Sequence, residues 1–289
     1  MMDWNKLLSS RRYQPGSTIT MFRSHDRSQF QRDYDRLIFS APFRRLQNKT
    51  QVFPLPGNIF VHNRLTHSLE VASVGRSLGN KIAQFVKTKE TLEHPEILEE
   101  IGTIVSTACL AHDLGNPPFG HSGEEAISYF FTEGEGQYLK KLLTDEEWAD
   151  ISHFEGNANT FRLLTHSFNG RRPGGYTMTF TTLASIVKYP FESKASIKGH
   201  KYGFFQSEKE IYKEMAEELG IIQLNTKPLQ YVRHPLVYLV EAADDICYQI
   251  MDIEDSHKLK ILSYDETTRI LLNFYDKDID KEDLKTISK

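Results

Sequence analysis

The chain lacks the features that would assign it to a secreted, membrane-spanning or strongly charged class of proteins. Only two of its 289 residues are cysteines, so we expect no disulfide framework. No apolar run is long enough to span a bilayer, and the N-terminus MMDWNKLLSSRRYQPG lacks the apolar core of a signal peptide. The net charge of −4 provides no overall footprint for nucleic acid. These absences predict a cytoplasmic protein that contacts no membrane.

What remains is an ordinary globular composition, with 39% hydrophobic and 26% charged residues, in which helical patterns predominate. Apolar residues recur at helical spacing from Ser28 to about Leu46, where Pro42 is expected to kink or divide the helix, and again over 64–86. The stretch 50–63 instead alternates around a Pro-Gly turn, which predicts a small hairpin. We therefore expect a mainly α fold, a helical bundle with a minor β-hairpin.

Some helix starts can also be located from the sequence. Thr144 with Glu147, and Ser207 with Glu210, have the spacing of capping boxes, in which a hydroxyl and a carboxylate satisfy free amides at the start of a helix. The first twenty or so residues are polar and irregular, and we assign them no structure beyond a tail or docking arm.

The stretch ACLAHDLGNPPFGHSGE, residues 108–124, is the most informative part of the chain. An apolar helical run ends there in His112 and Asp113, and the two prolines that follow prevent the helix from continuing. Gly115 suits a left-handed position that ends a helix. The run is apolar on most sides, so the helix should be largely buried, and two ionisable groups at its end need compensation.

A histidine next to an aspartate has two interpretations. The pair suits a hard-to-intermediate divalent cation such as Mn, Fe, Co, Zn or, with more oxygen donors, Mg. Alternatively, His112 caps the helix C-terminus, where its charge favours the helix dipole, and Asp113 accepts from a nearby amide. For an isolated pair the second interpretation is favoured, so the choice depends on further ligands elsewhere in the chain.

Two other predicted helices supply such ligands. His67 lies in the first turn of one, and Asp244 lies on the acidic side of a long apolar helix near the C-terminus. Asp244, Tyr248 and Asp252 are spaced to form one stripe on that helix, which favours Asp244 over the adjacent Asp245. A helical bundle projects such side chains inward, and four ligands leave positions open for water and a substrate oxygen.

Five strings resemble one family and occur in the expected order: RLTHSLEVASVGR, AHDLGNPPFGHSGEEA, HFEGNANTFRLL, VKYPFESK and EAADDICYQIMDIEDS. They resemble the deoxyguanosine triphosphate triphosphohydrolases (dGTPases), a branch of the HD-domain metal-dependent phosphohydrolases. A His-Asp dipeptide alone carries little information, whereas five long strings are specific. The resemblance runs from about Arg27 to Asp255.

The resemblance implies three parts of the chain. Residues 1–26 form an N-terminal arm, 27–260 an HD-domain catalytic core, and 261–289 the start of a C-terminal helical region. No fold-completing element is evident at that end, so we expect the fold to be completed by further chain or in a homo-oligomer.

The resemblance also implies an activity, the hydrolysis of a deoxynucleoside triphosphate, with dGTP favoured, to the deoxynucleoside and intact inorganic triphosphate. The metal ligands are then His67, His112, Asp113 and Asp244. Mn²⁺ or Mg²⁺ is the expected ion, and the same ligands accept Fe, Co, Zn or Ni. His121, paired with Glu124, becomes the general acid for the departing 5′-oxygen. The alternative is that His121 only caps the following helix.

The resemblance assigns the remaining site residues to the substrate. The triphosphate would be contacted by Arg64, Lys188 and Lys201, with Asn116, Asn157 and Tyr189 beside them. The sugar 3′-hydroxyl would be held by Gln51 and Asp252. Tyr248 would pack against the sugar at the point where a ribose 2′-hydroxyl would clash. For each lysine, a solvated surface position is the alternative.

Two other functions stay open at this stage. An HD-domain phosphohydrolase could act on nucleoside monophosphates or cyclic nucleotides, although the long GNPPFGHSGE string argues against it. The chain could also be a nucleotide sensor or bind single-stranded nucleic acid through the arginines between Arg27 and Arg45. By default those arginines form a solvated face, paired with Asp26, Asp33 and Asp35.

Overall fold

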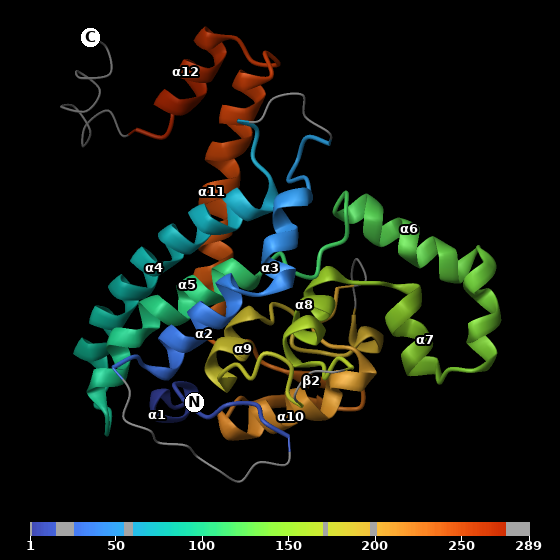
Figure 1. The fold of residues 1–289 in the computed structure, drawn as a ribbon. Coiled ribbons are helices and arrows are strands. Elements are labelled where there is room, and N and C mark those ends of the chain that lie inside the picture. The colour runs from blue at the N-terminus through green and yellow to red at the C-terminus, as the bar shows by residue number, and fades with distance from the viewer. Residues whose placement is uncertain (1, 16–25, 55–59, 170–172, 197–200, 276–289) are drawn as a thin grey trace.

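The computed structural model describes residues 2–15, 26–54, 60–169, 173–196 and 201–275, and it is built almost entirely from helices (Figure 1). Its one sheet has two antiparallel strands, β1 (Gln223–Thr226) and β2 (Leu229–Tyr231). The expected mainly α fold is therefore confirmed. Within the described ranges, no helix is both long enough and apolar enough to cross a membrane.

Helix α5 (Ile101–Ala111) lies at the centre of the bundle. Every residue of it except Thr103 is buried, as its apolar pattern predicted. The helices α2 (Gln29–Ile38), α4 (Arg64–Lys89), α9 (Phe180–Ile186) and α11 (Val237–Lys258) pack around it. The end of α5 is thus enclosed by other helices, which is where the His-Asp pair begins.

Two glycines set the close packing of α4 on α5. A Cβ atom at Gly79 would lie 2.8 Å from the Cα atom of Gly102, closer than real Cβ contacts allow. The two backbones therefore touch directly at this point. This contact helps to fix the angle at which α4 carries its first turn towards the end of α5.

The predicted helix from Ser28 is divided near Pro42, as expected. Helix α2 ends at Ile38, and Pro42 lies in the first turn of α3 (Ala41–Arg45), which continues into η1 (Leu46–Asn48). Proline is tolerated at such a start because the amide it lacks would have no partner within the helix.

The N-terminal residues are not an irregular tail throughout. Helix α1 (Trp4–Leu7) packs onto the bundle, and Leu7 and Leu8 are almost fully buried. Arg12 forms an ion pair of 2.6 Å with the buried Asp33. The prediction was wrong here because two leucines among polar residues are too short a pattern to reveal a buried helix. The prediction for 16–25 lies outside the described residues.

Of the hairpin predicted over 50–63, the described residues 50–54 and 60–63 form no strand. A single bridge joins Thr50 to Asn63, and the Pro-Gly turn at 56–57 lies outside the described residues. The sheet of the structure is instead β1–β2, which the sequence did not predict because every residue of β1 is exposed and shows no alternation.

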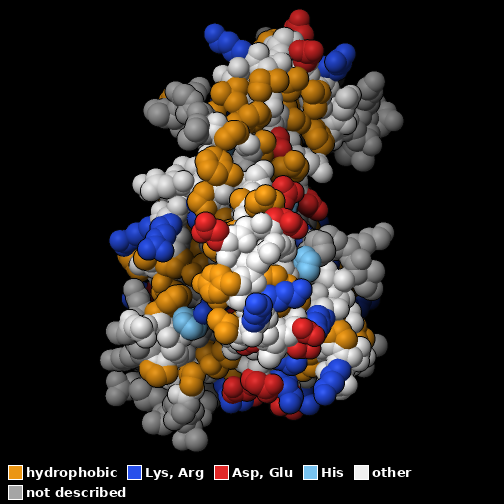
Figure 2. Space-filling view, turned by 90° about the vertical axis from the view of Figure 1, so that its right-hand side faces the viewer, with side chains coloured by type: hydrophobic (Ala, Val, Ile, Leu, Met, Phe, Trp, Pro, Cys, Tyr) orange, Lys and Arg blue, Asp and Glu red, His pale blue; other side chains and the backbone are white. Residues whose placement is uncertain are grey.

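The other elements surround this bundle or extend from it (Figure 1). They are η2 (Pro95–Glu100), α6 (His121–Thr132), η3 (Glu135–Lys141), α7 (Asp145–Ser152), α8 (Gly156–Thr165), η4 (Ser193–Ala195), η5 (Gln206–Glu208), α10 (Lys209–Glu218) and α12 (Tyr264–Leu272). In Figure 1, α6 and α7 extend to the right of the body and α12 lies at the top. Figure 2 shows apolar side chains gathered in its upper part, where α11 and α12 lie; these helices expose Ile246, Ile250 and Tyr264.

One of the two predicted capping boxes is present. Thr144 and Glu147 satisfy each other's backbone amides at the start of α7. The box predicted for Ser207 and Glu210 is absent, because α10 begins only at Lys209 and the Ser207 hydroxyl instead donates to the carboxylate of Glu208. A 3₁₀ turn has taken the place of the expected first helical turn.

A buried histidine ties the N-terminal segment to the start of α11. His234 is 1% exposed; its Nε2–H donates to the carbonyl of Leu7 (3.2 Å) and its Nδ1 accepts from the amide of Leu236 (3.2 Å). Burial lowers the pKa of His234 to about 4. The ring is therefore neutral in the folded protein at neutral pH.

This histidine makes stability depend on pH. An unfolded histidine titrates near pH 6.5, so the unfolded chain binds the extra proton first and stability falls as pH drops from about 6.5 towards 4, by on the order of 3 kcal/mol. We expect His234→Gln to flatten this part of the curve of unfolding free energy against pH, measured by urea denaturation. His94→Gln, at an exposed histidine, is the control and should leave the slope unchanged. Equal slopes in both variants would contradict the assignment.

Candidate functional site

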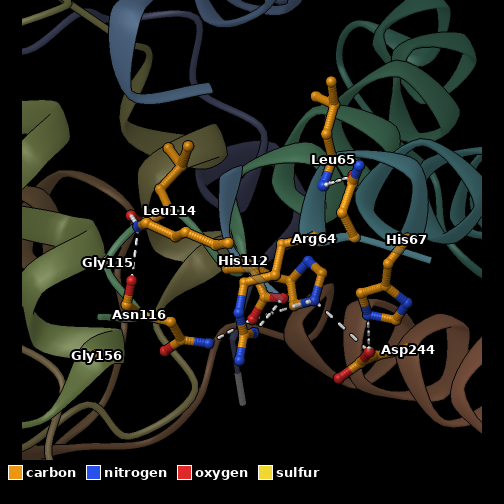
Figure 3. Close-up of polar contacts among 12 residues, drawn as sticks. Arg64, Leu65, His67, His112, Leu114, Gly115, Asn116, Gly156 and Asp244 are labelled. Atoms are coloured by element: carbon orange, nitrogen blue, oxygen red, sulfur yellow. Dashed lines mark hydrogen bonds and ion pairs between the residues drawn. The ribbon is translucent and has the colours of Figure 1, made fainter. Parts of the chain in front are cut away.

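Three of the predicted ligands converge where α4, α5 and α11 meet (Figure 3). His67 comes from the first turn of α4, His112 caps the end of α5, and Asp113 follows it. Each offers one ligand atom, and these three atoms all lie within 4.8 Å of one another. Side chains from separate parts of the chain thus form one compact donor cluster.

Asp244 on α11 adds a fourth donor. Its Oδ1 lies 2.9 Å from Nε2 of His67 and 3.6 Å from Nε2 of His112. The adjacent Asp245 is exposed. Of the two adjacent aspartates, Asp244 is therefore the one that contacts the histidines, and its role as a metal ligand stays a prediction.

The two rings present the same nitrogen to this cluster. Nδ1 of His112 donates to the carbonyl of Cys109 (2.6 Å), which leaves Nε2 facing Asp113 and Asp244. Nε2 of His67 faces Asp244, while its Nδ1 lies 3.5 Å from the sulfur of Met251. Two imidazole nitrogens and two carboxylates suit a divalent first-row metal ion.

His112 and the carboxylates of the cluster shift one another's pKa values towards the charged forms. Burial alone would lower the pKa of His112, but the carboxylates of Asp113 and Asp244 outweigh it and raise the pKa to about 9. The pKa of Asp244 is lowered far below its usual range: burial would raise it, and His112 and His67 overcome that effect. The carboxylates thus favour positive charge at this point, which a divalent cation also supplies.

Asp113 has further partners that fix its position. Nη1 of Arg64 lies 2.6 Å from its Oδ2, and Nδ2 of Asn116 donates to its Oδ1 at 2.5 Å. Arg64 is only 7% exposed. The structure therefore places Arg64 and Asn116, both predicted to contact substrate, directly against a metal-ligand candidate as well as on the pocket wall.

The turn after Asp113 differs from the prediction in one respect. Gly115 is not among the residues with positive φ; Phe119 and Gly120 have those conformations. Gly115 is needed for space, since a Cβ there would lie 2.1 Å from the carbonyl oxygen of Gly156. The close approach of α8, rather than a left-handed helix end, therefore explains this glycine.

His121 and Glu124 form a pair at the start of α6. Nδ1 of His121 lies 2.8 Å from Oε2 of Glu124, and the His121 side chain is 82% exposed. Oε1 of Glu124 accepts from the amide of Gly156 (2.8 Å). A nearly buried carboxylate thus orients an exposed imidazole, whose Nε2 is the ring nitrogen available to a ligand.

Three of the metal-ligand candidates, His112, Asp113 and Asp244, share one pocket of about 450 Å³ with the His121–Glu124 pair. Its lining includes most of the predicted substrate residues: Gln51, Arg64, Asn116, Asn157, Lys188, Tyr189, Lys201 and Tyr248. Two predicted residues are not in the lining. His67 lies behind Asp244, and Asp252 hydrogen-bonds to Tyr248, whose pKa it raises.

Both pocket lysines are paired with carboxylates that the sequence analysis did not single out. Nζ of Lys188 lies 2.9 Å from Glu241, and Nζ of Lys201 lies 3.0 Å from Glu155. Glu241 could have been found from its place one turn before Asp244, and Glu155 only from its position before the helix that begins near Asn157. Neither lysine occupies the solvated surface position that was the alternative.

Two of the five arginines from Arg27 to Arg45 contact other groups of the chain. Arg27 pairs with Asp35, and Arg36 donates to the backbone carbonyl and hydroxyl of Thr177. Arg44 and Arg45 are exposed, and their side chains form no ion pair with the described residues. Arg44 and Arg45 are thus the exposed candidates for a nucleic-acid contact, which stays a prediction.

The donor set predicts which aspartate binds a divalent ion. Asp244→Asn should weaken Mn²⁺ binding at least about tenfold, because it removes the charge that faces both imidazoles. Asp245→Asn is the matched control on the adjacent, exposed position and should bind as the parent does. Calorimetric titration and metal content after dialysis would measure both. Equal losses in the two variants would contradict the assignment.

Known proteins match most of this chain. Residues 64–189 match the family described as HD domain. A deoxyguanosinetriphosphate triphosphohydrolase-like protein of Pseudomonas aeruginosa is 44% identical over 284 residues, which cover 96% of this chain and 62% of that protein. A protein of the same description from Synechocystis sp. is 44% identical over 277 residues (91% and 62%). The deoxyguanosinetriphosphate triphosphohydrolase of Yersinia enterocolitica is 36% identical over 272 residues (82% and 51%).

The chain spans about three fifths of the length of the first two relatives. An HD domain implies a divalent metal ion, in agreement with the cluster of His67, His112 and Asp113. The matched region contains these three residues together with the His121–Glu124 pair. The chain thus carries a match to the HD domain over residues 64–189 and is similar over most of its length to proteins named deoxyguanosinetriphosphate triphosphohydrolase or deoxyguanosinetriphosphate triphosphohydrolase-like.

Proposed function

We propose that this chain hydrolyses a deoxynucleoside triphosphate, with dGTP preferred, to the deoxynucleoside and inorganic triphosphate. The observation that carries the proposal is a single pocket in which a metal-ligand cluster, a histidine–glutamate pair and two lysines face one another. The names of the relatives support both the dGTP preference and the triphosphate product.

His67, His112, Asp113 and Asp244 would hold the divalent ion, Mn²⁺ or Mg²⁺ in this proposal. When bound, such an ion supplies Lewis-acid polarisation of a phosphoryl oxygen and lowers the pKa of water. The chain itself keeps the donor atoms in place through Arg64 and Asn116, which both contact Asp113.

His121 would act as the general acid. Water attacks the α-phosphorus, the bond from that phosphorus to the 5′-oxygen breaks, and the 5′-oxygen takes a proton from Nε2 of His121. An alkoxide is a poor leaving group, and a histidine can carry the required proton near neutral pH. Glu124 contacts Nδ1 at 2.8 Å and so orients the ring for the transfer.

The other pocket residues would bind the substrate. Lys188 and Lys201 bring positive charge to the triphosphate, and Asn157 and Tyr189 line the same wall. Oε1 of Gln51 is buried and has no hydrogen-bond partner among the described residues, so it can accept a hydrogen bond from a sugar hydroxyl. Asp252 would reach the sugar together with Tyr248, to which it is bonded.

We also propose a homo-oligomer and the three-part organisation of arm, HD core and C-terminal helical region. The exposed apolar residues of α11 and α12, such as Ile246, Ile250 and Tyr264, support an interface between copies. Action on monophosphates or cyclic nucleotides is the alternative, but several lining cations fit a longer polyphosphate better.

Product analysis tests the reaction directly. With Mn²⁺ or Mg²⁺ we expect dGTP to yield deoxyguanosine and triphosphate, resolved by phosphorus NMR or ion chromatography. The other three deoxynucleotides and GTP, assayed in parallel, would rank selectivity, with dGTP first and GTP last. Release of pyrophosphate and a monophosphate would contradict both the reaction and the role of His121. Absence of product with either metal would contradict the activity of this chain.

His121→Ala separates chemistry from binding. Because the ring is exposed and is not a metal-ligand candidate, we expect turnover to fall by at least about a hundredfold while metal content and dGTP affinity change little. Ser122→Ala, on the next exposed position of α6, is the control and should keep full activity. Single-turnover kinetics and equilibrium binding would measure the two effects. Parallel loss of binding and turnover would make His121 a binding residue instead.

A further inference from the structure

Glu155 is a nearly fully buried carboxylate beside the pocket, with an exposed fraction of 1%. It lies at the N-cap of α8, where Oε1 accepts from the amide of Asn157 (3.1 Å) and from its side-chain Nδ2 (2.5 Å). Oε1 of Glu155 therefore caps the N-terminus of α8 and orients the side chain of Asn157. The proposed reaction leaves the second oxygen of this buried group without a role.

That second oxygen holds a lysine that also reaches the catalytic pair. Oε2 of Glu155 lies 3.0 Å from Nζ of Lys201, and the same Nζ lies 3.6 Å from Oε2 of Glu124. Oε2 of Glu124 is the atom that faces Nδ1 of His121. Lys201 thus lies between two carboxylates, and His121 and Lys201 compete for one oxygen.

The backbone makes the same connection by a second route. Gly156, the residue after Glu155, donates its amide to the other oxygen of Glu124 at 2.8 Å. A Cβ at Gly156 would lie 2.9 Å from that oxygen, so the two segments are in direct contact. The first residue of α8 therefore helps to fix the position of the Glu124 carboxylate.

We propose that Glu155 is a positioning residue for the proton donor: by binding Lys201 more closely than Glu124 does, it keeps the Glu124 carboxylate available to the His121 ring. The proposal rests on the proposed function, in which His121 supplies a proton. Burial lowers the pKa of Lys201, and the carboxylates of Glu155 and Glu124 outweigh it and raise the pKa, in keeping with a shared ammonium.

The direction in which the His121 midpoint should move on loss of the Glu155 carboxylate follows from the charges nearby. Without the Glu155 charge, the Lys201 ammonium pairs with Glu124 alone and neutralises the partner of His121. The protonated ring is then less stable, and His121 titrates at lower pH. The other charged groups facing this corner are Arg64 from α4, whose Nη2 would lie 2.9 Å from a Cβ at Gly120, and the remaining charged residues of the pocket wall: His112, Asp113, Lys188, Glu241 and Asp244.

Glu155→Gln tests the proposal, with Glu241→Gln as the matched control. Both changes neutralise a carboxylate that pairs with a pocket lysine, but only the lysine of Glu155 also touches Glu124. We expect the pH midpoint of the His121 ring, followed by NMR in metal-free protein, to fall by about half a unit or more in Glu155→Gln. It should stay in place in Glu241→Gln. An unchanged midpoint in the first variant, or equal shifts in both, would overturn the proposal.

A double mutant tests whether Glu155 acts through the lysine. Lys201→Gln removes the competitor and should raise the His121 midpoint, the opposite direction to Glu155→Gln. The double variant should match Lys201→Gln alone, because no ammonium remains to be redirected. Independent, additive shifts would overturn the coupling.

Glu155→Asp retains the charge and a cap acceptor, so it should return the midpoint towards that of the parent, and a failure to do so would count against the proposal.

The readout distinguishes this proposal from the proposed function. The ring titration needs no turnover, so it can succeed or fail whatever products the parent protein forms. If the parent releases triphosphate, the basic limb of kcat against pH should move down with the ring midpoint in Glu155→Gln. A change confined to KM, with that limb unmoved, would make Glu155 a substrate-binding support only and would overturn the proposal.

Discussion

Asp113 is a carboxylate buried at the end of a buried helix, and much of the site is arranged to compensate for it. An isolated charge at 6% exposure would cost several kcal/mol or would take up a proton. Arg64 and Asn116 contact its two oxygens, and His112 lies 3.7 Å away. These partners come from α4, the end of α5 and the turn beyond it. Satisfying one charge thus brings together the elements that also carry the metal-ligand candidates.

The cations of the pocket wall are also paired with carboxylates. Each lysine of the lining has a carboxylate partner, Lys188 with Glu241 and Lys201 with Glu155, and Arg64 is paired with Asp113. Among the described residues, each lysine and arginine of the pocket wall is therefore already paired with a carboxylate. A nucleotide would share these cations with carboxylates already present, and a divalent ion would offset the remaining negative charge. Binding of the phosphates should therefore depend on binding of the metal ion, because the ion offsets negative charge in the pocket.

Patterns local to one helix were predictable, and contacts between segments were less so. The burial of α5, the division of the helix at Pro42 and the choice of Asp244 over Asp245 each follow from spacing along a single helix. The missing box at Ser207 and the buried α1 do not, because a 3₁₀ turn and a short apolar pair depend on what packs against them. Gly115 was placed in the wrong role for the same reason, since its neighbour is in α8.

The helical class, the resemblance to one family and the residue types that could bind a divalent ion were predictable from the sequence alone, because these depend on periodicity and on motifs within short segments. It could not determine that Lys201 lies between Glu155 and Glu124, or that Lys188 pairs with Glu241. Those residues are separated along the chain and carry no periodic signal. Only the packing of α6, α8 and α11 decides which carboxylate meets which cation, since the strength of an ion pair depends on distance and burial rather than on sequence order.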